Sequence, residues 1–145
     1  MGTTVTTYDA FQHSTAVRQP QDKSVAMDCP YTGKGEEFSP TNLVEAALAG
    51  CMLMSMGTLA MRHEELDISG ARIEVAISTT DKPIVRYDAI DITVTIPRDF
   101  PPRDRVGLQR AADLCPIKNS FAKDIPITVH FEYPDSQAQA REASA

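Results

Sequence analysis

The sequence has no tryptophan, only three cysteines and fewer basic than acidic residues, and each shortage excludes a class of protein. Without tryptophan, and with 6% aromatic residues, there is little material for aromatic cages or base-stacking surfaces. Lys and Arg number 14 against 20 Asp and Glu, a net charge of −6, so the basic patch of a free-standing nucleic-acid binder is not visible. Three cysteines are too few for a secreted disulfide scaffold, which favours a reducing, cytoplasmic setting.

Long apolar runs are also missing. The longest uncharged stretch, Ala46–Met61, has 16 residues and includes Gly50 and Ser55, whereas a membrane-spanning helix needs roughly 20 apolar residues. The N-terminus shows no secretory signal pattern. We therefore expect no membrane partner. A length of 145 residues with 42% hydrophobic residues fits one domain, or one protomer of an obligate dimer. We predict a single domain over residues 1–133 and a flexible tail over 134–145.

Strand patterns occur near both ends of the chain. Residues 3–28 are rich in Thr and Val and predict two or three antiparallel strands, with turns near Asp9–Ala10 and Gln19–Pro20. Residues 29–39 carry Pro, Gly and charges, which predicts a loop. Alternating apolar residues predict further strands at residues 73–77, 90–96 and 127–133.

The most distinctive segment begins at Ser39-Pro40, a typical helix start with Ser39 as the N-cap. From Pro40 the sequence continues without a helix breaker until after Glu65. Apolar residues fall on every side of this predicted helix, so it must be enclosed on all sides. One chain of this length can hardly do that alone. We expect a central helix wrapped by sheets, with a partner subunit completing the cover.

A second helix is predicted from Pro101-Pro102 to Leu114. Its apolar face has helical spacing and consists of Leu108, Ala111, Ala112 and Cys115. Because Cys115 precedes Pro116, the helix should end there, and a short third helix, Pro116–Lys123, should begin with Cys115 as its cap. The order of elements predicts an α+β fold with antiparallel sheets.

Familiar metal and nucleotide motifs are absent. The sequence contains no C-x-x-C, H-E-x-x-H, Walker or G-x-G-x-x-G pattern. The three histidines, His13, His63 and His130, lack ligand spacing and are interpreted as polar or solvated residues. We therefore predict no metal and no cofactor.

The cysteines allow two interpretations. Free cysteine packs well as a small buried hydrophobe, and this structural interpretation covers all three residues. Alternatively, Cys51 and Cys115 meet in the core if their helices pack side by side. Gly50 leaves room beside Cys51, and a helix start would stabilise a Cys115 thiolate. Cys29 lies in the loop and is assigned no role.

Two segments carry a resemblance to a known family. The stretch SPTNLVEAALAGCMLMSM, followed by LQRAADLCPIKNSF, resembles the OsmC/Ohr family (osmotically inducible protein C and organic hydroperoxide resistance protein). The pattern is a Pro-led, Ala-rich helix with Ala-Gly-Cys, then a helix that ends in Cys-Pro, with 64 residues from one cysteine to the other. The resemblance covers roughly residues 25–133.

This resemblance implies an intertwined homodimer with central helices enclosed by sheets, and a peroxidase that reduces organic hydroperoxides. Cys51 would be the peroxidatic thiol and Cys115 the resolving thiol, joined in a disulfide during turnover. A lipoyl-type dithiol would be the reductant. The alternatives are a non-catalytic protein that binds an apolar small molecule at the dimer interface, and a thiol redox sensor.

Two positions differ from the family pattern. Thr41 stands where the family's hydroperoxide reductases carry Glu after the helix-opening Pro. The loop before the helix contains Lys34 but no Arg, so Arg18, Lys34 or another cation would have to stabilise the Cys51 thiolate. Replacements for the missing carboxylate are Glu36, Glu37 and Glu45, and the sequence does not choose among them.

Overall fold

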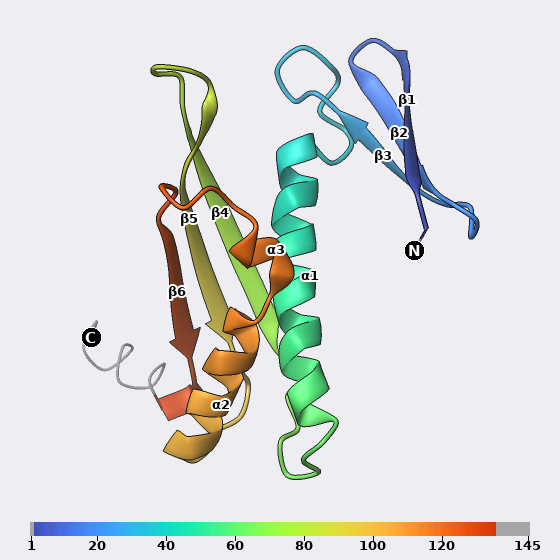
Figure 1. Ribbon diagram of the computed structural model, residues 1–145. Helices are drawn as coiled ribbons and strands as arrows, with labels where there is room; N and C mark the ends of the chain where they lie inside the picture. Colours follow the sequence, from blue (N-terminus) through green and yellow to red (C-terminus); the bar gives the residue numbers. More distant parts are fainter. Residues whose placement is uncertain (1, 136–145) are drawn as a thin grey trace. The chain divides into compact units, whose positions relative to one another are not determined.

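The computed structural model describes residues 2–135, so the predicted tail lies outside the described residues apart from its first two positions. The chain forms two compact units, Met1–Val44 and Glu45–Ala145. Each unit is described by itself below (Figure 1).

The N-terminal unit is a three-stranded antiparallel sheet in the order β1-β2-β3. Its strands are Thr4–Ala10, His13–Arg18 and Lys23–Asp28, as the Thr- and Val-rich pattern predicted. The loop that follows returns to β3, where Phe38 bridges Met27 and accepts the Asp28 N–H through its carbonyl. Only Ala16 and Asp28 are buried within this sheet, so its strands are held mainly by backbone hydrogen bonds.

The helix α1 spans Pro40–Ala60. It begins with a reciprocal cap, in which the Asn42 N–H donates to Ser39 Oγ and the Ser39 N–H donates to Asn42 Oδ1. The predicted end at Glu65 is wrong by five residues. Arg62 and the three residues that follow are all exposed and offer no apolar face, and the last turn closes with i→i+3 bonds such as Arg62 N–H to Leu59 O.

A second sheet, in the order β4-β5-β6, forms the base of the C-terminal unit. Its strands are Arg72–Thr80, Arg86–Thr95 and Ile127–Glu132. β4 and β5 form an antiparallel hairpin, but β5 and β6 are parallel, with Ile90 opposite Ile127. The expectation of wholly antiparallel sheets is therefore wrong for β6. A parallel neighbour needs a crossover connection, and the two helices between β5 and β6 supply it.

Those two helices are α2, Pro102–Asp113, and α3, Pro116–Asn119. α2 agrees with its prediction, and Cys115 caps α3 as predicted. α3 ends four residues earlier than expected. The Ser120 hydroxyl bonds the Pro116 carbonyl, and the half-buried Phe121 turns into the hydrophobic cluster, which removes it from a helical path.

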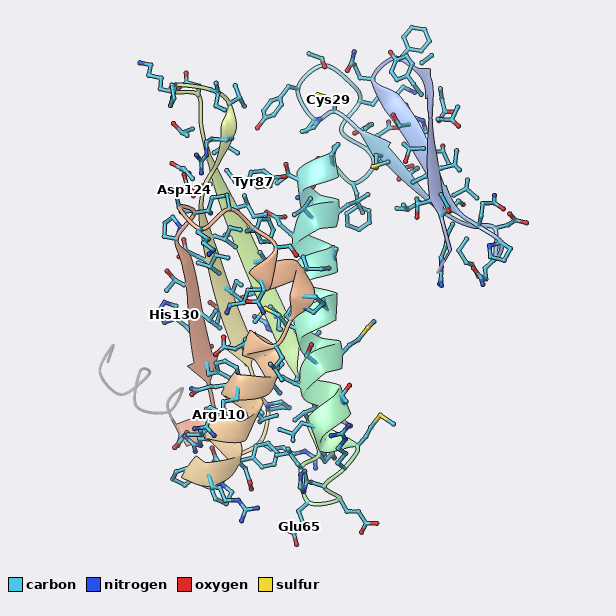
Figure 2. The ribbon with its side chains drawn as sticks, viewed as in Figure 1. Cys29, Glu65, Tyr87, Arg110, Asp124 and His130 are labelled. Atoms are coloured by element: carbon cyan, nitrogen blue, oxygen red, sulfur yellow. The ribbon has the colours of Figure 1, made fainter. Side chains whose placement is uncertain are left out.

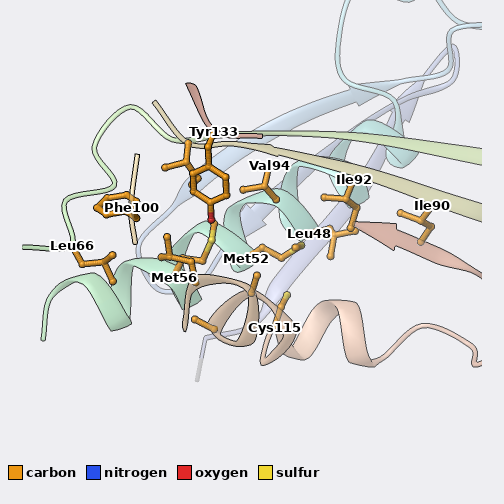
Figure 3. Packing of buried hydrophobic residues seen from close by; sticks show 14 residues of the cluster. Leu48, Met52, Met56, Leu66, Ile90, Ile92, Val94, Phe100, Cys115 and Tyr133 are labelled. Carbon is orange, nitrogen blue, oxygen red and sulfur yellow. The ribbon is translucent and has the colours of Figure 1, made fainter. Parts of the chain in front are cut away.

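The core of the C-terminal unit lies between the sheet and the helices (Figure 3). One face of β5 contributes its alternate residues, and α1 and α2 contribute one stripe each; these fully buried side chains are Ile90, Ile92, Val94, Ile96, Leu48, Met52, Met56 and Leu108. Because a single face of β5 contacts both helices, the unit is a two-layer α+β structure.

Within the C-terminal unit, the opposite face of α1 is not covered. Only Leu48, Met52 and Met56 are buried along the helix, whereas Met54 is 74% exposed. The predicted enclosure of α1 on all sides is therefore not provided by the C-terminal unit alone. α1 is long and apolar enough to cross a membrane, and 17% of its most apolar 18-residue stretch is buried. Its exposed apolar face therefore needs a physical explanation.

Candidate functional site: a paired thiol centre

Cys51 lies in the middle of α1, at the edge of its buried stripe. Its neighbours Leu48 and Met52 point into the core, while Ala47 and Met54 are exposed. Cys51 itself is half-buried. It therefore borders the core on one side and is open to the outer face of α1 on the other.

The outer face of α1 beside Cys51 forms a shallow groove of about 470 Å³. Its lining is Ala46, Ala47, Gly50, Cys51, Met54, Ser55, Thr58 and Ile117. The two hydroxyl groups are turned back onto the helix, because Ser55 Oγ donates to Cys51 O and Thr58 Oγ1 donates to Met54 O. The groove therefore presents a mostly apolar surface around one thiol.

Cys115 occupies the junction between α2 and α3 and is fully buried. Its N–H donates to Ala112 O at 3.1 Å, and its sulfur accepts the Lys118 N–H at 3.4 Å. Buried residues of α1 and α2 surround this junction (Figure 3). The position follows from the sequence: Leu108, Ala111 and Ala112 bury the α2 face that leads to Cys115, and Pro116 ends α2 there.

The two thiols are brought together. Cys51 and Cys115 are both free, and they lie close enough for Cys51 to affect the pKa of the Cys115 thiol. Burial raises the pKa of the Cys115 thiol, and the neighbouring Cys51 sulfur raises the same pKa further, against the opposing effect of the Lys118 N–H. The fold therefore places Cys51 and Cys115 as neighbours, with Cys115 buried and Cys51 at the edge of the core, and their chemical roles stay a prediction. Cys115 keeps its proton at neutral pH.

The carboxylates proposed from the sequence lie in different settings. Glu45 Oε1 accepts the Ile77 N–H of the edge strand β4 at 3.3 Å, so it ties α1 to the sheet. Glu36 and Glu37 are exposed in the loop of the N-terminal unit. The candidate cations Arg18 and Lys34 also belong to that unit. Within the C-terminal unit, the ammonium of Lys118 is bound to Asp113 at 2.7 Å.

The turn at Cys29 has an unexpected chemical character (Figure 2). Thr32 Oγ1 donates to Cys29 Sγ at 3.2 Å, and backbone N–H groups of Tyr31, Thr32 and Gly33 also stabilise the thiolate. These bonds lower the pKa of Cys29 to about 7, with the Thr32 hydroxyl as the largest cause. The sequence interpretation assigned Cys29 no role and missed this reactivity. The repeated Cys-Pro pair, at residues 29–30 and 115–116, was the available signal.

The three histidines lie in exposed or polar surroundings, unlike the paired thiols. His63 and His130 are exposed, as interpreted from the sequence, and His130 stands on the face of β6 opposite the half-buried Val129 (Figure 2). His13 Nδ1 lies 2.8 Å from Asp9 Oδ2. Within residues 2–135, no group of three or more His, Cys, Asp or Glu side chains is placed to hold a metal ion.

A more enclosed cavity of about 380 Å³ lies elsewhere, between the end of α1 and the start of α2. Its lining mixes polar and apolar residues. It includes His63, Glu65, Arg103 and Asp104, but no thiol. Of these two hollows, the groove beside Cys51 is the one that contains a thiol.

Comparisons with known proteins identify the family and the fold. A family model described as OsmC-like protein matches residues 33–130. A crystal structure from Psychrobacter arcticus 273-4, whose name refers to osmotic stress induction and the detoxification response, is 30% identical, with a TM-score of 0.82 over 91% of this chain and 96% of that one. No curated protein matches the sequence.

More distant structures share the fold. An OsmC-like protein of Mycoplasma pneumoniae is 15% identical, with a TM-score of 0.80 over 92% of this chain and 96% of that one. The organic hydroperoxide resistance protein OhrB of Bacillus subtilis is also 15% identical, with a TM-score of 0.67 over 90% and 98% of the two chains. The fold is an α+β fold in which Cys51 and Cys115 are neighbouring free thiols. The chain belongs to the OsmC-like protein family.

Proposed function

We propose that this protein is a thiol-dependent peroxidase that reduces organic hydroperoxides to alcohols in the cytoplasm. The observation that carries the proposal is the contact between the Cys51 and Cys115 thiols at an apolar groove. Such a groove favours an alkyl or fatty-acid hydroperoxide over hydrogen peroxide, since an alkyl chain gains by leaving water. The name of the distant OhrB structure points to the same substrate class.

The reaction balances with the two thiols and an external dithiol. The Cys51 thiolate attacks the O–O bond of the hydroperoxide, which takes up a proton, leaves as the alcohol and converts Cys51 to a sulfenic acid. The Cys115 thiol condenses with that sulfenic acid, forming a disulfide and releasing water. A lipoyl-type dithiol then reduces the disulfide to two thiols and is itself oxidised to a disulfide. No metal, haem or flavin takes part.

The different surroundings of the two thiols support their order of action. Cys51 borders the groove, where a hydroperoxide can reach it. Cys115 is buried, and its raised pKa keeps it protonated, so it is the poorer initial nucleophile. Cys51 is therefore the peroxidatic thiol and Cys115 the resolving thiol, in agreement with the family resemblance.

A peroxide-consumption assay with three matched variants tests this function. Cumene hydroperoxide and dihydrolipoamide are supplied to the parent, Cys51→Ser, Cys115→Ser and Cys29→Ser proteins. We expect consumption to be lost in Cys51→Ser and retained in Cys29→Ser, with sulfenic acid trapped by dimedone in Cys115→Ser. Equal consumption by the parent and Cys51→Ser would refute the proposal.

The source of positive charge for the Cys51 thiolate is tested in the same assay. Arg18 and Lys34 are the candidates from the N-terminal unit. Removing the correct cation destabilises the attacking thiolate, so kcat/KM for the hydroperoxide should fall. Arg18→Gln and Lys34→Gln serve as controls for each other, because we expect the fall in only one of them.

We propose further that the protein is a homodimer in which a second copy covers the outer face of α1. Met54 and Met61 are 74% and 90% exposed, and an apolar surface of this kind marks an interface. An added Cβ at Gly50 or Gly57 meets nothing within 4 Å, so the chain's own packing does not require these helix glycines. Close approach of another backbone explains them.

Light scattering of the detergent-free protein measures this assembly. We expect twice the mass of one chain, and a shift toward the monomer in Met54→Glu, which would bring a charge from each copy into the interface. A matched change on the exposed N-terminal sheet, Tyr8→Glu, should leave the mass unchanged if that side chain remains in solvent. A monomeric parent, or a parent recovered only with membranes, would exclude the homodimer.

A redox sensor is the second candidate, favoured by the same thiol contact and by Thr41 at the position where family reductases carry Glu. In a sensor the Cys51–Cys115 disulfide forms but is not turned over. Treatment with one equivalent of hydroperoxide, followed by peptide mapping, distinguishes the sensor from the peroxidase. A disulfide without steady-state consumption in the presence of dithiol identifies the sensor, and an apolar ligand bound without any disulfide identifies a non-catalytic binder.

A further inference from the structure

The segment that carries Cys115 is held by two side-chain bonds that span the junction between α2 and α3. Lys118 Nζ lies 2.7 Å from Asp113 Oδ1, and Asn119 Nδ2 donates to the backbone oxygen of Asp113 at 2.9 Å. We call Asp113, Lys118 and Asn119 the α2–α3 clamp. Both bonds return to the last residue of α2, so the clamp ties α3 back onto α2.

α3 depends on such bonds because it is very short. A helix of four residues, Pro116–Asn119, is not stable by its own backbone bonds. None of its residues is fully buried, and Ile117 only borders the hydrophobic cluster. By contrast, α2 is anchored by three buried residues. The Lys118 side chain is only 16% exposed, which is unusual for lysine unless its charge is paired.

The clamp residues also contact Cys115 directly through their backbones. The Lys118 N–H donates to Cys115 Sγ at 3.4 Å, and the Asn119 N–H donates to Cys115 O at 3.1 Å. The same two residues therefore bond Cys115 through their main chains and Asp113 through their side chains. A change in the angle between α3 and α2 would move the Cys115 sulfur away from Cys51.

We propose that the α2–α3 clamp is a positioning device for the resolving step, holding Cys115 Sγ where it can attack Cys51. This inference rests on the proposed function, in which the hydroperoxide is the oxidant. The Cys51 sulfenic acid and the Cys115 thiol form one S–S bond and release water. A disulfide tolerates a narrow range of Cα separation and dihedral angle, so the correct placement of the second thiol governs its rate. None of the three clamp residues lines the groove, so the first step does not require them.

Rapid mixing with one equivalent of cumene hydroperoxide separates the two steps. In the double variant Lys118→Met, Asn119→Ala, we expect the Cys51 sulfenic acid, trapped by dimedone, to last about tenfold longer than in the parent. The first phase, loss of the Cys51 thiolate, should stay within about twofold of the parent. Lys123→Met, which removes an exposed lysine beyond α3, is the matched control and should match the parent in both phases.

A charge swap distinguishes positioning from general damage. Asp113→Lys alone should slow disulfide formation, and Asp113→Lys with Lys118→Asp should restore it, because the ion pair is rebuilt with opposite polarity. An unchanged sulfenic acid lifetime in the Lys118→Met, Asn119→Ala protein would overturn the inference. So would a failure of the swap to restore the rate in a protein with the parent's circular dichroism spectrum.

A redox titration tests the clamp without any hydroperoxide. Oxidised glutathione converts the two thiols to the Cys51–Cys115 disulfide and is reduced to two glutathione molecules, which yields the effective concentration of one thiol at the other. We expect this concentration to fall about tenfold in the double variant. If the parent consumes no hydroperoxide but the titration shows this fall, the proposed function fails and the clamp stands. If the parent is an active peroxidase but the clamp substitutions change neither the sulfenic acid lifetime nor the effective concentration, the positioning role of the clamp is refuted and the proposed function stands.

Discussion

Two turns of this protein begin with the same Cys-Pro pair and share a pattern of backbone hydrogen bonds, yet the pKa values of their thiols differ. In each, the cysteine carbonyl accepts the N–H four residues later, from Gly33 to Cys29 at 2.8 Å and from Asn119 to Cys115 at 3.1 Å. Each sulfur also receives the N–H three residues later. The pKa of Cys29 is lowered to about 7, whereas the pKa of Cys115 is raised.

The difference comes from what surrounds each turn. The Cys29 turn belongs to an exposed loop and adds the Thr32 hydroxyl to the backbone donors. In the second turn Cys115 itself is buried in the core, where desolvation penalises the thiolate and the Cys51 sulfur adds to the effect. Backbone donors alone therefore do not decide the acidity of a thiol. Burial reverses their effect, and at Cys115 this leaves a protonated partner for Cys51.

The largest expected effect is on the free energy of unfolding and concerns the core in which Cys115 is buried. Met52 is fully buried in the cluster that includes Cys115, so Met52→Ala leaves a cavity and should lower the free energy of unfolding by about 2–5 kcal/mol. Tyr31, in the Cys29 turn, is 92% exposed, and Tyr31→Ala should change the same quantity by less than about 0.5 kcal/mol. Urea denaturation measures both. Similar losses would show that the first turn is also supported by packing.

The next effect is the reactivity of the thiols themselves. At pH 7 a thiol of pKa about 7 is half ionised, while the raised pKa of the buried Cys115 thiol keeps it protonated. Iodoacetamide should therefore modify Cys29 at least about tenfold faster than Cys115. Peptide mapping of a time course gives both rates in one sample. Equal rates would contradict the role given to burial.

Much of this architecture follows from local pattern. Alternation from Ile90 to Ile96 indicated a strand with one buried face, and Ser39-Pro40 marked the start of α1. The helix spacing also predicted that Cys115 lies on the buried side of the chain at the end of α2, which its burial confirms. Such features depend on neighbours in the sequence and on burial, which a single chain displays directly.

The missed features depend on distant geometry. The parallel pairing of Ile127 with Ile90 requires knowing that α2 and α3 cross over the sheet. The bond from Lys118 to Asp113 depends on the angle between two helices, which periodicity does not specify. The end of α1 after Ala60 is set by where the chain must turn back toward the buried Leu66. A sequence pattern predicts which face of a helix or strand is buried, whereas these contacts form between separate helices and strands.

A smaller effect isolates the hydroxyl that the first turn has and the second lacks. Thr32 Oγ1 donates to the Cys29 thiolate, so its removal destabilises the charged form and raises the pKa. In Thr32→Val, the midpoint of Cys29 alkylation against pH should therefore move upward from about pH 7 by roughly one unit. Thr32→Ser, which keeps the hydroxyl, should leave the midpoint in place. A midpoint unchanged in Thr32→Val would assign the acidity to the backbone donors alone.

The smallest effect concerns two glycines near these thiols, and here the surroundings predict opposite signs. An added Cβ at Gly33 would lie 2.7 Å from Cys29 O, so Gly33→Ala must distort the first turn. At Gly50, beside Cys51, an added Cβ meets nothing within 4 Å in the single chain, and alanine is the better helix former by about 0.5–1 kcal/mol. Gly50→Ala should therefore stabilise an isolated chain by that amount.

If a second copy approaches α1 at Gly50, the methyl group instead weakens the assembly. Unfolding measured at low and high protein concentration separates the two terms, because only the assembled protein gains stability with concentration. A gain at both concentrations would place the partner elsewhere and leave the groove beside Cys51 open to solvent.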